Sequence, residues 1–219
     1  MILNVMAIIV PGILTNDEMD YEKRLRLAEH VASLIQIDVV DGEFAKSQTV
    51  QIDTIKKYGS SRFLEIQLMV VKPLEYIRSL VTVDYVSRII YPIEAQDDVN
   101  EINYEIRRAN KQIGISLNPE TPIEAALKLL ESVDLLLLLA GKPGFSGQKL
   151  GVNTFERIRQ AKSFAPEMAL EIDIGVNEEN AKQLAEAGVD FLVTSSAVYN
   201  APDFYLAYEK LAKLASVRT

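Results

Sequence analysis

The stretch that decides the fold is VDLLLLLAGKPGFSGQK, residues 133–149. Its apolar run, Leu135–Leu139, has the length of one β-strand and is too short to cross a membrane. An unbroken apolar run of this length is typical of a parallel strand that is buried on both faces. The glycine-rich segment GKPGFSGQK follows directly. The stretch therefore predicts a buried parallel strand whose carboxyl end leads into a glycine-rich loop.

Comparable apolar runs recur on both sides of this stretch, and amphipathic helical patterns separate them. Examples of the helical patterns are VNEINYEIRRAN at 99–110, IEAALKLLESV at 123–133 and NTFERIRQAKSF at 153–164. This alternation predicts repeated βα units. The eight expected strands are Leu3–Val10, Leu34–Val39, Phe63–Met69, Tyr85–Tyr91, Gln112–Leu117, Leu135–Leu139, Ala169–Asp173 and Phe191–Thr194.

Eight βα units can close into a barrel or form an open, doubly wound sheet. No GxGxxG segment follows the first strand, which argues against a dinucleotide-binding sheet. Polar residues follow many of the strands instead of gathering at one crevice, as expected for a barrel. The length of 219 residues also suits one such barrel. We therefore expect an α/β fold, a (β/α)8 TIM barrel, as a single domain over residues 1–219.

Composition limits the function. The chain has 23 Lys and Arg against 31 Asp and Glu, a formal net charge of −8, which disfavours nonspecific binding of nucleic acid. It has no Cys, which excludes disulfides, thiolate chemistry and zinc sites of the Cys type. The apolar N-terminal run is short and has no basic leader, so we expect no membrane segment and a cytoplasmic protein.

Two aspartates are the candidates for acid/base chemistry. In IQIDVVDGEF, residues 35–44, the period of two places Gln36 and Asp38 on one face of a strand, which we expect to face inward. Asp41, beside a glycine, is better explained as a turn cap. In LEIDIGVN, residues 170–177, Asp173 ends its strand. Two inward carboxylates could act as base and acid on opposite faces of one carbon, and two unrelated polar strand ends remain the alternative.

A phosphate cradle is the third candidate feature. Glycines allow backbone N–H groups to approach an anion, and the loops after the last strands of a barrel commonly hold phosphate. Asn118 could also face a substrate, although Asn118-Pro119 is an equally good turn starter. His30, the only histidine, lies in a helical pattern and is given no role. The candidate binding residues are Gly144, Phe145, Ser146, Gly147, Gly175, Ser195, Ser196 and Asn118.

Taken together, the motifs resemble the ribulose-phosphate 3-epimerase family along nearly the whole chain. The stretches that carry the resemblance are IVPGIL, IQIDVVDGEF, EIQLMVVKP, ISLNPETP, VDLLLLLAGKPGFSGQK, LEIDIGVNEENAKQLAEAGVD and TSSAVY. The resemblance implies a ribulose-phosphate-binding barrel that epimerises C3 of a ketose phosphate, such as D-ribulose 5-phosphate, in pentose phosphate metabolism. It further implies that Asp38 and Asp173 exchange the proton through an enediolate. No organic cofactor is expected, and a homo-oligomer is a common arrangement for such barrels.

The chain departs from the family pattern at the metal site. The family holds a divalent metal with two histidines and the two aspartates, and both histidine positions carry Gln here, Gln36 and Gln67. Two carboxylates and two amides could hold Mg²⁺ or nothing. Ile174 replaces the first glycine of the family's Asp-Gly-Gly. The alternative function is therefore a barrel that binds a phosphosugar with lost or altered catalysis.

Overall fold

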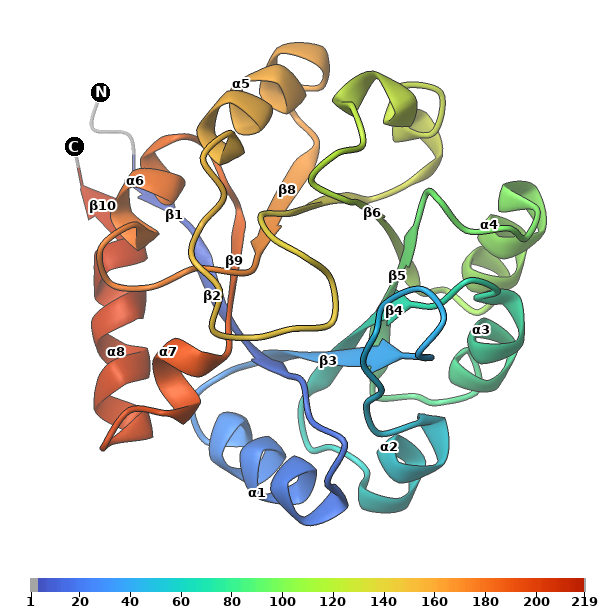
Figure 1. Cartoon of the computed structure of the whole chain (residues 1–219), viewed down its shortest axis with the longest axis horizontal. Coiled ribbons are helices and arrows are strands. Elements are labelled where there is room, and N and C mark those ends of the chain that lie inside the picture. The colour runs from blue at the N-terminus through green and yellow to red at the C-terminus, as the bar shows by residue number, and fades with distance from the viewer. Residues whose placement is uncertain (1–3, 219) are drawn as a thin grey trace.

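The chain forms a closed barrel of eight parallel strands with helices around the outside (Figure 1). The structure is a computed structural model that describes residues 4–218. Neighbouring strands follow chain order, and the last pairs with the first, Ile8 with Phe191, to close the barrel. The expected TIM barrel is confirmed. Its strands are β2 (Ile8–Ile13), β3 (Leu34–Val40), β4 (Phe63–Met69), β5 (Val86–Pro92), β6 (Gln112–Leu117), β7 (Leu135–Leu139), β8 (Ala169–Asp173) and β9 (Phe191–Thr194).

The first strand differs from its prediction. The expected strand Leu3–Val10 begins outside the described residues and spans two separate elements, so its bounds were wrong. β1 (Asn4–Met6) pairs antiparallel with β10 (Ser216–Arg218), outside the barrel. The barrel strand β2 begins at Ile8 and continues through Pro11 and Gly12, two residues that usually argue against a strand interior. The break depends on a partner from the far end of the chain, which local hydropathy does not reveal.

Eight α-helices of the described chain surround the barrel, and one expected helix is absent there. Residues 123–133 form two short 3₁₀ helices, η1 (Ile123–Ala126) and η2 (Leu130–Ser132), in place of one α-helix. A pattern this short becomes an α-helix only where packing favours it. The helices are α1 (Glu18–Glu29), α2 (Ile52–Tyr58), α3 (Leu74–Leu80), α4 (Val99–Arg108), α5 (Thr154–Phe164), α6 (Ala181–Glu186), α7 (Ser196–Tyr199) and α8 (Phe204–Ala215).

The strands pack on both faces, as their apolar runs predict. On β7, Leu136 and Leu138 belong to the large core between barrel and helices. Leu135, Leu137 and Leu139 pack inside the barrel in a separate apolar cluster. Because alternate residues of a strand face opposite sides, one run of five leucines serves both cores. The interior of the barrel is therefore packed, and polar side chains within it are deeply buried.

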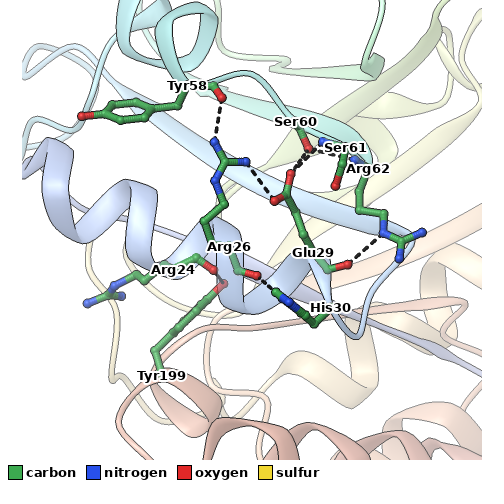
Figure 2. Close-up of polar contacts among 9 residues, drawn as sticks. All are labelled: Arg24, Arg26, Glu29, His30, Tyr58, Ser60, Ser61, Arg62 and Tyr199. Carbon is green, nitrogen blue, oxygen red and sulfur yellow. Dashed lines mark hydrogen bonds and ion pairs between the residues drawn. The ribbon is translucent and has the colours of Figure 1, made fainter.

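Helix α1 is fixed to the segment between α2 and β4 by a polar network (Figure 2). Arg26 donates to Glu29 over 2.9 Å and to the carbonyl of Tyr58 over 2.8 Å, while Glu29 accepts from the N–H of Ser61 over 2.7 Å. The exposed His30 ring lies 2.6 Å from the carbonyl of Arg26, and it meets the ring of Tyr205 edge to face with 6.2 Å between the ring centres. Within residues 4–218, no helix is long and apolar enough to cross a membrane.

Candidate active site

A pocket opens at the carboxyl ends of the strands. The loop that joins β7 to α5 lies across the centre of the barrel mouth in Figure 1. Ser47 from the loop after β3 donates to the carbonyl of Gly144 over 2.7 Å and so ties two loops together over this end of the barrel. The lining residues are Leu14, Asp38, Met69, Gly144, Phe145, Ser146, Gly147, Asp173, Ile174, Gly175, Val176, Val193, Ser195 and Ser196.

The two candidate aspartates meet at the bottom of this pocket. Asp38 lies near the end of β3 and Asp173 ends β8, and both are buried, 4% and 8% exposed. Gln67 is paired with Asp38 in the register of β3 and β4. Closure of the barrel brings the Gln67 amide against both acids, 2.9 Å from Asp38 Oδ1 and 3.0 Å from Asp173 Oδ2. Both carboxylates thus lie within hydrogen-bond distance of the same amide atom of Gln67.

The orientation of the Gln67 amide follows from its neighbours. With the nitrogen toward the two aspartates, the amide donates to both and also lies 3.0 Å from the amide nitrogen of Gln36. In the opposite orientation its oxygen accepts from Gln36 Nε2 over 3.0 Å and faces both carboxylates. We take the first orientation, because it gives two buried carboxylate oxygens a donor. Gln36, also fully buried, donates from Nε2 to Asp38 Oδ1 over 2.8 Å. The main-chain N–H of Ile174 donates to Asp173 Oδ1 over 2.7 Å. Neutral donors alone therefore hold the two acids.

Burial makes both aspartates weak acids. Burial, followed by repulsion from Asp173, raises the pKa of Asp38 well above its usual range. Burial also raises the pKa of Asp173 to about 6, while the N–H of Ile174 and the amide of Gln36 oppose the shift. Two adjacent buried carboxyl groups whose protein donors are neutral share a proton near neutral pH. Such a pair contains one acid and one base, which is what proton transfer across a carbon requires.

The expected phosphate loops line the same pocket. Gly144, Gly147 and Gly175 have φ values of +82°, +76° and +82°, a conformation that favours glycine. A Cβ on Gly175 would lie 2.4 Å from the backbone nitrogen of Leu150, so the close approach of these two loops requires glycine there. Ser195 lines the pocket, and its buried Oγ has no hydrogen-bond partner among the described residues. The cradle offers backbone and hydroxyl groups to an anion.

The structure places one expected binding residue elsewhere. Asn118 is not among the residues that line the pocket, and its buried side-chain Oδ1 has no hydrogen-bond partner among the described residues. Its N–H donates to Glu94 over 3.2 Å, and its carbonyl accepts from Arg157 over 2.9 Å. These contacts match the turn-starter alternative. The other seven expected binding residues all line the pocket, together with apolar residues that the sequence had not singled out, among them Met69 and Val193.

A second polar cluster lies deeper in the barrel and was not predicted. Arg88 on β5 donates to Glu65 on β4 over 2.7 Å and lies 3.5 Å from Glu171 on β8. Its guanidinium also lies 4.7 Å from the centre of the Phe191 ring. Burial raises the pKa of Glu65 to about 7 despite Arg88, and burial followed by repulsion from Glu65 raises the pKa of Glu171 well above its usual range. This cluster lies beneath the aspartates and does not line the pocket.

The fold and this site define a (β/α)8 barrel with its candidate active site at the carboxyl ends of the strands. Residues 8–199 match the model of the ribulose-phosphate 3-epimerase family, and the chain belongs to that family. Ribulose-phosphate 3-epimerase of Chlamydia muridarum is 35% identical over 178 residues, which cover 78% of each chain. The Mycobacterium tuberculosis protein of the same name is 30% identical over 219 residues, covering 95% of this chain and 93% of that one.

Solved structures agree with the fold. The 3-hexulose-6-phosphate synthase of Salmonella typhimurium superposes with a TM-score of 0.73 at 14% identity, covering 94% of this chain and 97% of that one. A mutant tryptophan synthase α-subunit from Pyrococcus furiosus gives 0.72 at 13% identity, covering 99% and 100%. At such low identity these similarities support the barrel architecture alone.

The residues at the site do not fit the divalent metal that the family pattern implies. Within residues 4–218, no three His, Cys, Asp or Glu side chains form a group that could hold a metal ion. The amides of Gln36 and Gln67 present nitrogen, which has no lone pair to give, toward the carboxylates. Ligands for hard divalent cations in proteins are oxygen atoms, and softer cations prefer imidazole or thiolate.

Proposed function

We propose that this protein epimerises a ketose phosphate at C3, with D-ribulose 5-phosphate as the reference substrate. The observation that carries the proposal is the placement of Asp38 and Asp173 at the bottom of one pocket, both within 3.0 Å of the Gln67 amide. Epimerisation needs a base on one face of a carbon and an acid on the other. The relatives named ribulose-phosphate 3-epimerase support the same reaction class.

In this proposal the two aspartates exchange roles during each turnover. The ionised aspartate removes the proton from C3, and the electron pair of the broken C–H bond moves into an enediolate. The protonated aspartate then delivers its proton to the opposite face of C3, and the enediolate returns to the ketone. We assign Asp173 as the base at the start, because the N–H of Ile174 donates to Oδ1 of Asp173 over 2.7 Å and stabilises its anion. Asp38 is the acid, and the reverse reaction exchanges the two roles.

The phosphate of the substrate is assigned to the glycine loops and the two serines. Gly144, Gly147 and Gly175 allow main-chain N–H groups to approach an anion closely. Ser195 contributes a buried hydroxyl that has no partner among the described residues. No Lys or Arg lines the described pocket, so neutral donors would hold the phosphate. This assignment leaves the rest of the pocket, with Asp38 and Asp173, for the carbon chain of the sugar.

A second candidate function is binding of a phosphosugar without turnover. The observation that favours it is that amides, which supply no positive charge, occupy the positions beside both aspartates. Stabilisation of a developing oxyanion is usually a large contribution to catalysis, and its loss costs a rate factor of about 10²–10³. This candidate keeps the phosphate cradle and predicts affinity without proton exchange.

One isotope experiment separates the two functions. The protein is incubated with D-ribulose 5-phosphate in D₂O, and deuterium at C3 is followed by NMR. The epimerase proposal expects incorporation together with xylulose 5-phosphate, and it expects Asp38→Asn to lower the rate by about 10²–10⁴-fold. Calorimetry on the same samples tests binding. Binding without deuterium incorporation would favour the second function, and absence of binding would refute both.

A further inference from the structure

Gln67 is the residue that connects the two acids of the site. In its bridging orientation the amide nitrogen donates to Asp38 Oδ1 over 2.9 Å and to Asp173 Oδ2 over 3.0 Å. The side chain is 0% exposed, so water does not compete for these bonds. Hydrogen bonds to charged groups in a buried site are stronger than neutral ones. One neutral side chain on β4 therefore fixes the relative positions of acids on β3 and β8.

The carboxylate oxygens that a cation would need are largely in use. Oδ1 of Asp173 accepts from the N–H of Ile174 over 2.7 Å, and Oδ2 accepts from Gln67. Oδ1 of Asp38 accepts from Gln36 over 2.8 Å as well as from Gln67. Three of the four oxygens thus already have N–H donors from the protein. A cation between the acids would have to displace these donors and would then face amide nitrogens.

We propose that the site works without a divalent cation, and that Gln67 is the positioning residue that holds Asp38 and Asp173 together in its place. The catalytic part of this inference rests on the proposed function, and the metal part rests on the donor set alone. The amide can donate to either protonation state, so it serves the pair before and after proton transfer.

The metal part is tested without any measurement of turnover. The protein is purified without chelators, its metal content is measured by mass spectrometry, and Co²⁺ is titrated by calorimetry and by visible absorption. The matched comparison is the double variant Gln36→His and Gln67→His, which supplies imidazole ligands at both positions. We expect no bound equivalent and no Co²⁺ absorption band in the wild type, and both in the variant. A stoichiometric metal in the wild type that Asp38→Asn removes would overturn the proposal.

The positioning part is tested with Gln67→Met, which preserves the approximate volume and removes the amide. Loss of a buried hydrogen bond to a charged group corresponds to a decrease of roughly 10–100-fold in kcat. We expect that decrease with little change in KM, and a displaced pH profile, which a merely structural role would not produce. Chemical denaturation checks that the variant is folded. Unchanged kcat and pH profile in a folded variant would refute the role of Gln67, as would wild-type turnover that chelation abolishes and added metal restores.

An inactive wild type would distinguish the two proposals. If no deuterium enters C3 in any condition, the proposed epimerase function fails, and the metal titration still gives its own answer. If turnover occurs and depends on a divalent ion, the epimerase function stands and the inference about Gln67 fails. If turnover persists after chelation, both stand.

Discussion

Two pairs of buried carboxyl groups lie one above the other inside this barrel, and they are held in different ways. The lower pair, Glu65 and Glu171, shares the guanidinium of Arg88 at 2.7 and 3.5 Å. The upper pair, Asp38 and Asp173, shares the amide of Gln67 at 2.9 and 3.0 Å. Both pairs use strand β8, on which Glu171 and Asp173 are two residues apart and face the same side. The side chain shared by the lower pair is cationic, and the one shared by the upper pair is neutral.

This difference separates a structural pair from a chemical one. Arg88 balances one negative charge, the lower cluster does not line the pocket, and the 0% exposure of both glutamates keeps solvent away. The upper acids line the pocket, and their donors stabilise charge without cancelling it. Perturbed acids in a pocket are candidates for chemistry, whereas similar shifts in a closed ion-pair network are also found where the role is structural. Two carboxyl groups on β8, those of Glu171 and Asp173, thus have different roles: the first is structural and the second is a candidate for chemistry.

The largest expected effect comes from substituting the two acidic residues of β8 separately, Asp173 of the upper pair and Glu171 of the lower pair. Asp173→Asn removes the proposed base, so we expect the rate of deuterium incorporation at C3 to fall by about 10²–10⁴-fold. Glu171→Gln is the matched control, since it changes a buried carboxyl group two residues away that does not line the pocket. It should leave the rate close to that of the wild type. Equal decreases in the rate of deuterium incorporation for both variants would mean that the upper and lower pairs do not differ in function.

The next effect concerns stability. Arg88→Met leaves Glu65 and Glu171 buried without a cation, and breaking a buried ion pair in this way costs about 3–5 kcal/mol of unfolding free energy. The control combines Arg88→Met with Glu65→Gln and Glu171→Gln. Removal of all the charges should recover much of the loss, because buried ion pairs often contribute little net stability. Urea unfolding measures both proteins, and a triple variant no more stable than Arg88→Met would contradict this account of the lower cluster.

A smaller and more graded effect concerns pH. Folding raises the pKa of Glu65 from 4.5 to about 7 and that of Asp173 from 3.8 to about 6, so the folded state keeps protons that the unfolded chain releases. The stability contributed by these groups is fully present below their unfolded pKa values. It is lost as the pH rises through about 7 for Glu65 and through about 6 for Asp173. Each retained proton makes the slope about 1.4 kcal/mol per pH unit.

Variants of the two pairs show how much each pair contributes to the pH dependence of the unfolding free energy. Urea unfolding of the wild type and of Asp173→Asn between pH 4 and pH 8 should give curves whose difference changes mainly below about pH 6. The corresponding difference for Glu65→Gln should extend to about pH 7. Surface carboxyl groups contribute to all the curves equally and cancel in the differences. A constant difference across this range for either variant would show that the group is ionised in the folded protein.

Much of the fold was predictable because hydropathy reports burial on both faces of a strand. The bounds of β7 and β8 agree with their predictions. β7 is an unbroken apolar run, and β8 alternates apolar and acidic residues between polar segments. The break at Ala7 was not predictable, because it depends on pairing between β1 and β10 at opposite ends of the chain. The same limit applies to residues 123–133, where tertiary packing decides between α and 3₁₀ geometry.

The site was predictable in its positions and not in its contacts. Alternation along β3 and β8 places Asp38 and Asp173 inward, and the structure brings both to the pocket. The bridging position of Gln67 depends on how closure of the barrel staggers its strands, which no local pattern contains. The contact of Arg88 with Glu171 joins residues 83 positions apart, so neither hydropathy nor spacing could show it. The unexpected features are thus contacts between distant strands.

The smallest expected effect tests how the upper pair is positioned without a cation. Ile174 has φ +77°, a left-handed conformation that is unfavourable for a β-branched residue, and this conformation accompanies the 2.7 Å bond from its N–H to Asp173. Ile174→Ala keeps the conformational cost, whereas Ile174→Gly removes it. We expect the Gly variant to be more stable than the Ala variant by about 1 kcal/mol in urea unfolding. At most positions Ala is the more stable of the two, because Gly loses more entropy on folding. An Ala variant equal to or more stable than the Gly variant would therefore show that backbone strain does not hold Asp173 in place.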